Sequence, residues 1–422
     1  MNLSLTKWMI CSCVVMALIL GVYTNEPHPA SAVQQSTECP PVVDVEGITS
    51  SERLYFMVYD IYRDTPLDRV VQIWFIDGEG QHDTGVRVPF PSATNRVRAR
   101  LSLSGERMAL FFFFGEGDPP NMSGTVVLTL IDLLSGTTEN YSLNLQAQSY
   151  GSLTATYPDF ISSYYTEFSD LLWAWLDNDT IVFNQSETRF LFDTESGRLS
   201  PQAWPNNPWG STTDAWRLGG PSGSRFGFYG RFASAFPVRL HLKAVDLANG
   251  SIALDDLLVD GSGLSFSEDG TQLIFKSPQN ELVVHNLHSG EQIAAAIPES
   301  EQAIFDNAGY FVSSNDSSTI MLHISPDTPL LNGQVYLVKM GASGMETVSL
   351  CLRGETDYGF TRPAWSADGH YVFTLLTSPN EEILTETYVY DARHHVLERV
   401  IDNAQYESYL AQGLIYQVVG WE

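Results

Sequence analysis

A hairpin motif that recurs about every fifty residues is the feature that most constrains the fold of this 422-residue chain. In most copies an apolar run ends in Asp or Asn, and Gly follows a few positions later. Asp and Asn oxygens accept backbone N–H groups in tight bends, and Gly adopts the positive φ that such hairpins need. The closing positions are Gly80, Gly136, Gly197, Gly250, Gly290, Gly344 and His395, separated by 56, 61, 53, 40, 54 and 51 residues.

A unit of this length holds four short strands and their loops, and strand-like runs such as Leu54–Val58 and Met108–Phe114 dominate the chain. A second kind of hairpin, expected between the first two strands of a unit, occurs at 103–105, 177–179, 222–224, 267–270, 306–309 and 366–369. One such unit cannot bury both faces by itself, whereas stacking in a ring does so. We therefore predict an all-β fold, a β-propeller of seven four-stranded blades, with eight blades, one of them incomplete, as the alternative.

Closure of the ring is expected to involve the C-terminus. The run Leu414–Val419 (LIYQVV) has the composition of a strand and is able to complete the first blade, although Leu54–Val58 is a rival for the same place.

Two copies of the repeat resemble a known family. Leu264–Phe275 (LSFSEDGTQLIF) and Pro363–Phe373 (PAWSADGHYVF) are similar to the repeat of TolB-type, WD-repeat-like β-propellers, a type found in exported bacterial proteins. The resemblance extends over about residues 47–422 and is strongest in these two copies. It implies the propeller fold, an envelope or extracellular setting and contact with other proteins, and it implies no shared active site.

The N-terminus has the features of a targeting segment. Lys7 precedes the apolar run Trp8–Tyr23, and a polar stretch then ends in Ala30-Ser31-Ala32. This order is typical of a secretory signal peptide cleaved after Ala32. We predict a signal peptide at 1–32, a tail at 33–46 and a single propeller domain at 47–422, in a protein that is secreted or located in the periplasm or cell envelope. The alternative is an uncleaved membrane anchor, for which the run is somewhat short of about 20 residues.

The charge excludes two classes of partner. The chain has 22 Lys and Arg against 50 Asp and Glu, a net charge of −28. Binding to nucleic acid or to anionic lipid depends on clustered cations. We therefore expect no nucleic-acid partner, and membrane contact only if the leader remains as an anchor.

Cys39 and Cys351 are the cysteines that remain after cleavage at Ala32. In an exported chain they are able to form a disulfide that ties the tail to a late blade, or to stay as two independent thiols.

Loops on the open face of the propeller are the expected place for a site, because both kinds of hairpin lie on the opposite rim. The candidate loops are 59–69, 115–124, 201–214, 229–238, 313–332 and 377–387. The loop 201–214 contains Trp204 and Trp209, and Trp216 follows it. Their rings are suited to a sugar or a protein partner, or else they cap the hydrophobic gap between neighbouring blades.

Carboxylates of the same loops are further binding candidates, among them Glu116, Asp118 and Asp214. If these carboxylates meet in space, they are able to form a calcium site or a glycosidase acid/base pair, although no calcium-loop spacing occurs in the sequence. If they do not meet, they form a solvated acidic rim. No metalloprotease, nucleophile-elbow or phosphate-loop motif is present, so we expect no metal site and no cofactor.

These observations favour an exported, non-catalytic scaffold that binds a protein or glycan partner on the open propeller face. Two alternatives remain: a carbohydrate-active propeller enzyme that uses loop carboxylates, and the sensing ectodomain of a membrane-anchored protein.

Overall fold

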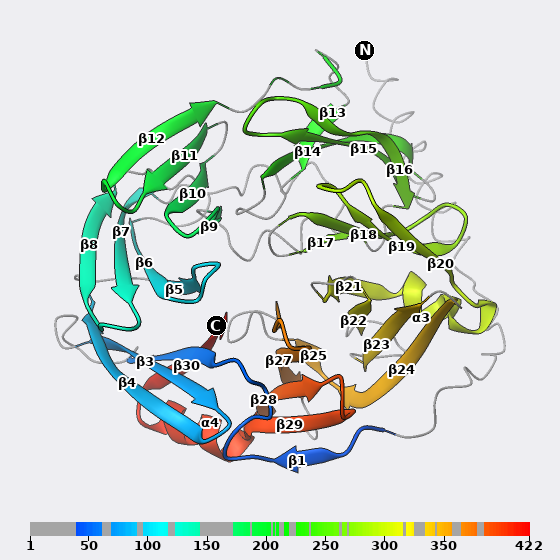
Figure 1. Cartoon of the computed structure of the whole chain (residues 1–422). Coiled ribbons are helices and arrows are strands. Elements are labelled where there is room, and N and C mark those ends of the chain that lie inside the picture. The colour runs from blue at the N-terminus through cyan, green and yellow to red at the C-terminus, as the bar shows by residue number, and fades with distance from the viewer. Residues whose placement is uncertain are drawn as a thin grey trace, which may run out of the picture.

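Seven sheets follow one another around a ring in the computed structural model (Figure 1). The structure describes residues 39–60, 69–90, 96–116, 123–143, 172–185, 188–203, 206, 208–210, 215–218, 225–235, 238–260, 264–267, 270–314, 318–324, 334–341, 344–356, 364–377 and 384–422. Each sheet is one blade, and its strands pair antiparallel except for one parallel edge strand in the seventh blade. The predicted all-β, seven-bladed propeller is confirmed, and the alternative of eight blades is wrong.

The blades are numbered in chain order, and their strands run from the centre of the ring outward. Blade 1 contains β30 (Leu414–Trp421), β2 (Leu54–Asp60), β3 (Val70–Asp77) and β4 (Gly80–Pro89). Blade 2 contains β5 (Arg96–Leu101), β6 (Arg107–Glu116), β7 (Ser123–Asp132) and β8 (Thr138–Leu143). Blade 3 contains β9 (Leu172–Trp175), β10 (Thr180–Gln185), β11 (Thr188–Asp193) and β12 (Arg198–Ala203). Blade 4 contains β13 (Ala215–Leu218), β14 (Phe226–Ala235), β15 (Val238–Asp246) and β16 (Ile252–Asp260).

The remaining blades follow the same order. Blade 5 contains β17 (Ser265–Phe266), β18 (Gln272–Lys276), β19 (Glu281–Asn286) and β20 (Gln292–Ala296). Blade 6 contains β21 (Ala308–Ser313), β22 (Thr319–Ile324), β23 (Gln334–Gly341) and β24 (Gly344–Arg353). Blade 7 contains the short β25 (Glu355–Thr356) and β26 (Ala364–Trp365), then β27 (His370–Thr377), β28 (Leu384–Asp391), β29 (Val396–Ile401) and β1 (Val42–Asp44). The described helices are η3 (Glu299–Glu301), α3 (Gln302–Asp306) and α4 (Asn403–Ala411).

The recurring hairpin of the sequence joins the third and fourth strands of every blade. All seven predicted closing positions have positive φ, from 54° at His395 to 126° at Gly80. His395 occupies the place that Gly takes in the other six blades, and its Nδ1 lies 2.8 Å from the Tyr390 hydroxyl. The fifty-residue period thus marks one defined hairpin of the blade.

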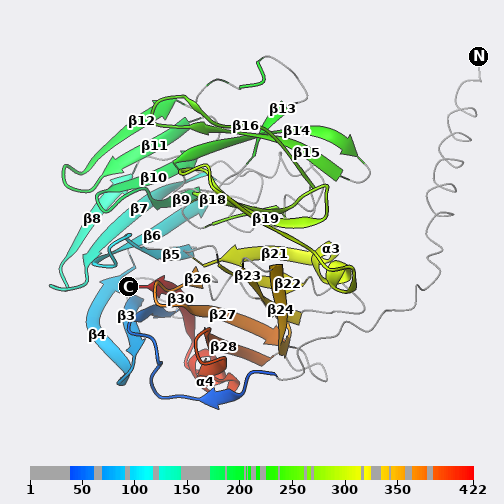
Figure 2. The same ribbon diagram turned by 45° about the vertical axis from the view of Figure 1, so that its right-hand side comes forward.

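The two ends of the chain close the ring. Strand β30 pairs antiparallel with β2, so that Leu54 lies opposite Trp421 and Asp60 opposite Leu414. The C-terminal strand therefore completes blade 1, as predicted. At the other end, β1 lies in the segment expected as a tail. It pairs parallel with β29 and covers the outer edge of blade 7 (Figure 2).

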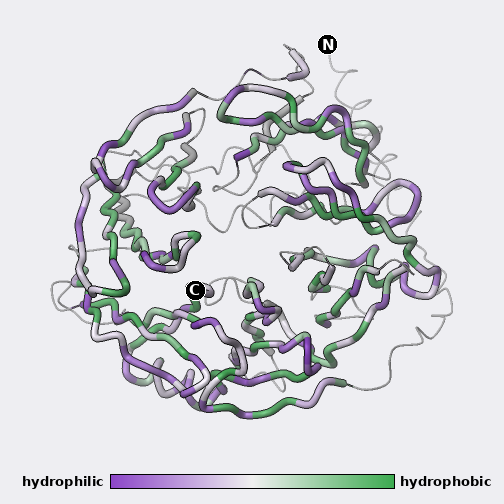
Figure 3. The backbone as a smooth tube through the Cα atoms, in the orientation of Figure 1, coloured by the Kyte–Doolittle hydropathy of each residue, from purple (hydrophilic) through white to green (hydrophobic). Residues whose placement is uncertain are grey.

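Hydrophobic residues hold neighbouring blades together. Because side chains alternate between the faces of a strand, a central strand contributes to the core on both sides of its blade, and hydrophobic and hydrophilic positions alternate along the chain in Figure 3. Between blades 7 and 1, for example, Val372 and Val389 pack in one cluster with Phe56 and Tyr406 of α4. Six such clusters join blades 1–2, 2–3, 4–5, 5–6, 6–7 and 7–1 in the described part of the chain.

Blade 6 differs from the prediction. The segment 306–309, expected as a hairpin after an apolar strand, instead follows helix α3, which buries Ile304 and Phe305 in the cluster between blades 5 and 6. The first strand of the blade is therefore β21, one element later than expected. Two buried apolar neighbours fit a single helical turn as well as a short strand, so their sequence does not separate the two.

Two of the candidate loops are also wrong as assigned. The segment 313–332 contains strand β22, and 229–238 is mostly strand β14, which continues to Ala235. Both segments contain polar or small residues of the kind that is common in loops. Their backbones nevertheless pair with neighbouring strands.

A half-buried carboxylate joins the N-terminal segment to blade 7. The side chain of Asp368 accepts hydrogen bonds from Ser50 Oγ (3.1 Å), Ser51 N (2.7 Å) and Ser51 Oγ (2.8 Å). It also accepts from Ser366 Oγ (2.6 Å) and lies 2.7 Å from His370 Nδ1. Burial alone would raise the pKa of Asp368, but these hydrogen bonds outweigh it and hold the pKa well below its usual range. The carboxylate thus links chain segments more than three hundred residues apart next to the closure.

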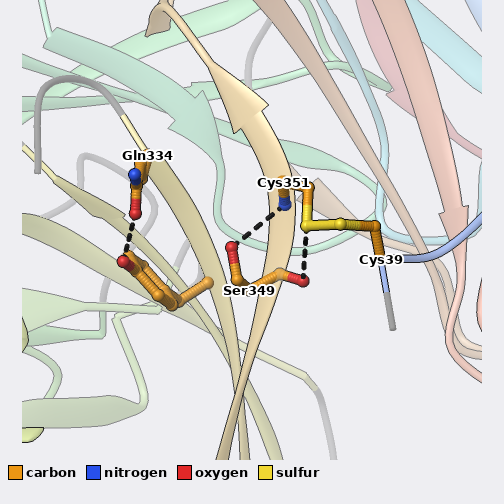
Figure 4. The surroundings of a disulfide bond; sticks show 5 residues. Cys39, Gln334, Ser349 and Cys351 are labelled. Atoms are coloured by element: carbon orange, nitrogen blue, oxygen red, sulfur yellow. Dashed lines mark hydrogen bonds between the residues drawn. A yellow bond between two sulfur atoms is a disulfide. The ribbon is translucent and has the colours of Figure 1, made fainter. Parts of the chain in front are cut away.

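A disulfide fastens the same N-terminal segment to blade 6 (Figure 4). Cys39 and Cys351 are 312 residues apart, and their Cα atoms are separated by 5.6 Å. Cys351 has a φ of 57° and lies where the register between β23 and β24 shifts, and its amide donates to Ser349 Oγ (3.1 Å). Such irregularities re-aim a side chain, and here they accompany an exposed Cys351. Of the two alternatives for the cysteines, the structure contains the bridge.

We expect Asp368→Asn to lower the free energy of unfolding by about 2 kcal/mol or more near pH 7, because an amide nitrogen would face hydrogen-bond donors. Since the folded pKa lies below the unfolded value of about 3.9, the carboxylate's contribution is complete at higher pH and is lost as pH falls toward the folded pKa. The difference between wild type and variant in urea unfolding should therefore be constant above about pH 5 and shrink as the pH is lowered further. Asp132→Asn, which breaks only a hairpin within blade 2, is the control; a difference that grows on acidification would contradict the assignment.

Reduction of the disulfide is expected to lower the melting temperature by several degrees, because closing so long a loop stabilises a fold by up to about 5 kcal/mol. Differential scanning calorimetry with and without dithiothreitol measures the shift. The double variant Cys39→Ser/Cys351→Ser should melt at the lower temperature under both conditions. An unchanged melting temperature of the wild type on reduction would count against a stabilising role.

Candidate functional site

Only one of the six predicted binding residues has a described side chain. Trp209 lies in the connection between blades 3 and 4. The backbones of Glu116 and Trp216 belong to β6 and β13, and their side chains lie outside the described part. Trp204, Asp118 and Asp214 lie outside the described residues altogether. Trp209 is therefore the predicted residue whose surroundings the structure describes.

Strand β15 of blade 4 has two chemically different faces. Its sequence, Val-Arg-Leu-His-Leu-Lys-Ala-Val-Asp, alternates between apolar residues and cations or histidine. Leu240, Leu242 and Ala244 pack into the cluster shared with blade 5. Period-two alternation therefore puts Arg239, His241 and Lys243 on the opposite face.

That opposite face is directed toward blade 3. Blade 5 occupies one side of blade 4, and blade 3 is its other neighbour in the ring (Figure 1). Gln202 Nε2 in β12 donates to the carbonyl oxygen of Leu247 (3.1 Å), which ties the two blades together. None of the six described hydrophobic clusters joins blades 3 and 4. In the described residues, polar and charged side chains mark this junction.

Trp209 packs on the charged face of blade 4. Its ring centroid lies 4.5 Å from Arg231 Cζ and 4.3 Å from Lys243 Nζ, and the ring meets His241 edge to face at 6.3 Å. Arg231 of β14 is the register partner of His241, so three residues from two adjacent strands surround the indole. Cations over an indole face are attracted by its quadrupole. We call Trp209, Arg231, Arg239, His241 and Lys243 the blade 4 seam face.

Exposed carboxylates neutralise part of this face. Asp255 lies 2.6 Å from Lys243 Nζ, and Asp256 lies 2.5 Å from His241 Nδ1. The side chains of Asp255 and Asp256 are 67% and 48% exposed, against 13% for Lys243. Asp256 has a φ of 58° next to the irregular pairing of β15 with β16. The cations are therefore recessed, whereas the carboxylates reach them from the solvent side.

Blade 3 contributes a buried cation to the same junction. Phe190 and Phe192 of β11 face the cluster with blade 2, so alternation directs Arg189 to the other side. Arg189 is 3% exposed, and burial lowers the pKa of its guanidinium to about 10. Cationic side chains thus approach the junction of blades 3 and 4 from both blades.

The arrangement is suited to binding anions. Guanidinium groups form bidentate hydrogen bonds with carboxylates, and the tryptophan restricts the motion of its two cationic neighbours. Sequence reasoning identified Trp209 and missed the cations. The signal that would have revealed them is the alternation in β15, where positively charged residues recur at every second position of an otherwise acidic chain.

A second polar cluster superficially resembles a catalytic triad. Thr49 Oγ1 lies 3.1 Å from His370 Nε2, and His370 Nδ1 faces Asp368. However, Thr49 Oγ1 also donates to Asp391 Oδ2 (3.2 Å), and its amide donates to Glu398. A threonine hydroxyl has one proton, and here it is donated to Asp391 rather than to the histidine, so the nucleophile-to-base hydrogen bond of a triad is not formed. We interpret the cluster as a structural link at the closure.

The described residues contain neither a metal-binding cluster nor a membrane-spanning helix. No group of three or more His, Cys, Asp or Glu side chains in this part of the chain is placed to hold a metal ion. No helix among the described elements is long and apolar enough to cross a membrane.

We expect Trp209→Ala to lower the free energy of unfolding by about 1–3 kcal/mol, through lost cation–π contacts and lost burial of the indole. Urea denaturation followed by circular dichroism measures the change. Leu134→Ala, at a side chain that is 78% exposed, is the control and should change stability by less than about 0.5 kcal/mol. Equal free energies of unfolding for the two variants would show that the indole does not stabilise the junction of blades 3 and 4.

The chain has distant structural similarity to solved β-propellers. No protein-family model and no curated protein sequence matches the chain. The β-propeller domain of Cps50 (Swd1) from Myceliophteria thermophila is similar in structure, with a TM-score of 0.36 and 11% identity over 73% of this chain and 86% of that one. TolB from Acinetobacter baumannii is similar with a TM-score of 0.33 and 13% identity, over 71% of this chain and 64% of that one. The chain is a seven-bladed β-propeller with distant structural similarity to WD-type and TolB propellers.

Proposed function

We propose that the protein is an exported, non-catalytic β-propeller that acts as a binding scaffold in the cell envelope or extracellular space. The observation that carries the proposal is the blade 4 seam face, where Trp209 lies against Arg231 and Lys243. Tryptophan and arginine are the residues most enriched among the energetically dominant contacts of protein interfaces. The face lies on a ring that is closed by hydrogen bonds, and a pre-organised scaffold lowers the ordering cost of binding.

Export is supported by two independent features. The leader combines Lys7, an apolar run and a small-x-small site at Ala30–Ala32. The bridge between Cys39 and Cys351 is the kind of cross-link that persists in oxidising compartments and is rare in the cytosol. Both features favour passage of the chain through a membrane into such a compartment.

Purification of the native protein from culture fluid and envelope fractions of its source tests both parts of the proposal. N-terminal sequencing should give a first residue at Val33, because cleavage is expected after Ala32. Mass spectrometry should identify a partner that is retained by folded protein and lost from heat-denatured bait. A first residue at Met1 in a membrane fraction would favour an anchored protein instead. Hydrolysis of common polysaccharides, or no retained partner from any fraction, would contradict a non-catalytic scaffold.

A further inference from the structure

We propose that the blade 4 seam face binds an acidic peptide segment of a partner protein through its Asp or Glu carboxylates. The inference rests on the proposed scaffold function and names the chemistry of the ligand. The charge of this face is the first observation that supports it. In a chain with a net charge of −28, three arginine and lysine side chains and one histidine lie on one face of two adjacent strands.

Two of these cations lack a carboxylate partner among the described residues. Arg231 contacts the ring of Trp209, and the Nε atom of Arg239 is buried without a hydrogen bond to any described group. Five other described arginines do have a carboxylate partner, as in the pairs of Arg225 with Asp246 and of Arg399 with Glu386. A half-buried guanidinium without a counter-ion carries a desolvation cost, which a carboxylate from a ligand relieves.

The chain itself shows how carboxylates reach this face. The consecutive residues Asp255 and Asp256 contact Lys243 and His241 from the solvent side. Arg239 lies two residues further along β15 on the same face, and Arg231 is the cross-strand neighbour of His241. Side chains at every second position of a strand lie about 7 Å apart, which is also the spacing of alternate residues in an extended peptide. A peptide with acidic residues at every second position therefore matches the row of cations.

The contacts of the tryptophan favour a peptide over a sugar. A pyranose stacks on a free aromatic face, whereas the ring of Trp209 already carries two cationic groups within 4.5 Å of its centroid. The indole therefore acts as a positioning residue that holds Arg231 and Lys243, and the ligand is recognised by the cations themselves.

Fluorescence polarisation with the full chain and a fluorescein-labelled peptide of alternating Glu and Thr residues tests this inference. We expect saturable binding of this peptide, and no binding of the matched peptide of alternating Gln and Thr. The double variant Arg231→Gln/Arg239→Gln should weaken binding about tenfold or more, because it removes both unpaired guanidinium groups. The control variant Arg198→Gln/Lys339→Gln removes the same charge at exposed positions of blades 3 and 6 and should stay within about twofold of wild type.

Arg231→Lys keeps the charge and loses the bidentate geometry, so we expect an intermediate affinity, and the melting temperature of each variant establishes that it is folded. Equal weakening by the seam and control variants would overturn the inference, since binding would then follow net charge alone. Binding of oligogalacturonate with no binding of the glutamate peptide would also overturn it, in favour of a glycan. If the seam variant retains the native partner, the inference fails and the scaffold function stands. If the wild type retains no native partner, the scaffold function fails whatever the peptide does.

Discussion

Antiparallel pairing of β30 with β2 is the interaction on which the rest of the structure depends. A blade buries its two faces only against its neighbours, so an open row of blades would leave apolar surface at both ends. The pairing joins the last strand of the chain to the first blade, so that neither end of the row of blades leaves its apolar surface exposed. Other long-range links fasten the N-terminal segment to the last two blades: β1 on the edge of blade 7, Asp368 bound to Ser50 and Ser51, and the Cys39–Cys351 bridge to blade 6. The stabilising links of the chain termini are thus concentrated where the ring closes.

The junction of blades 3 and 4 lies away from this closure and is built differently. Six other junctions contain a described hydrophobic cluster, whereas the described residues here include Arg189, Arg231 and Lys243. Charged side chains at such a place cost desolvation energy, which the fold tolerates because the ring is held on both sides by apolar contacts and closed elsewhere by hydrogen bonds. The proposed ligand would supply carboxylates to these recessed cations.

Most of the fold could be predicted from local chemistry. The seven hairpins were visible because each one needs a positive φ, and in six of them an Asp or Asn side chain accepts backbone N–H groups of the turn. Blade 6 was misassigned because Ile304 and Phe305 are equally apolar on a strand and in the helical turn that they occupy. The candidate site was predicted less well. Trp209 stood out by its residue type, but the cations of β15 gained significance only when the leucines between them were seen to face blade 5.

The sequence by itself determined the repeat, the four-stranded unit and the sites of its hairpins, because these depend on residues close together in the chain. It also determined the strongly negative charge and raised the pairing of Cys39 with Cys351 as one of two alternatives. Only the tertiary structure decided the number of blades, the strand that closes the ring, and the direction in which each face of β15 points. Those features depend on contacts between segments far apart in sequence, such as Leu54 with Trp421 and Trp209 with Lys243, and a local pattern carries no information about which distant segment will be the neighbour.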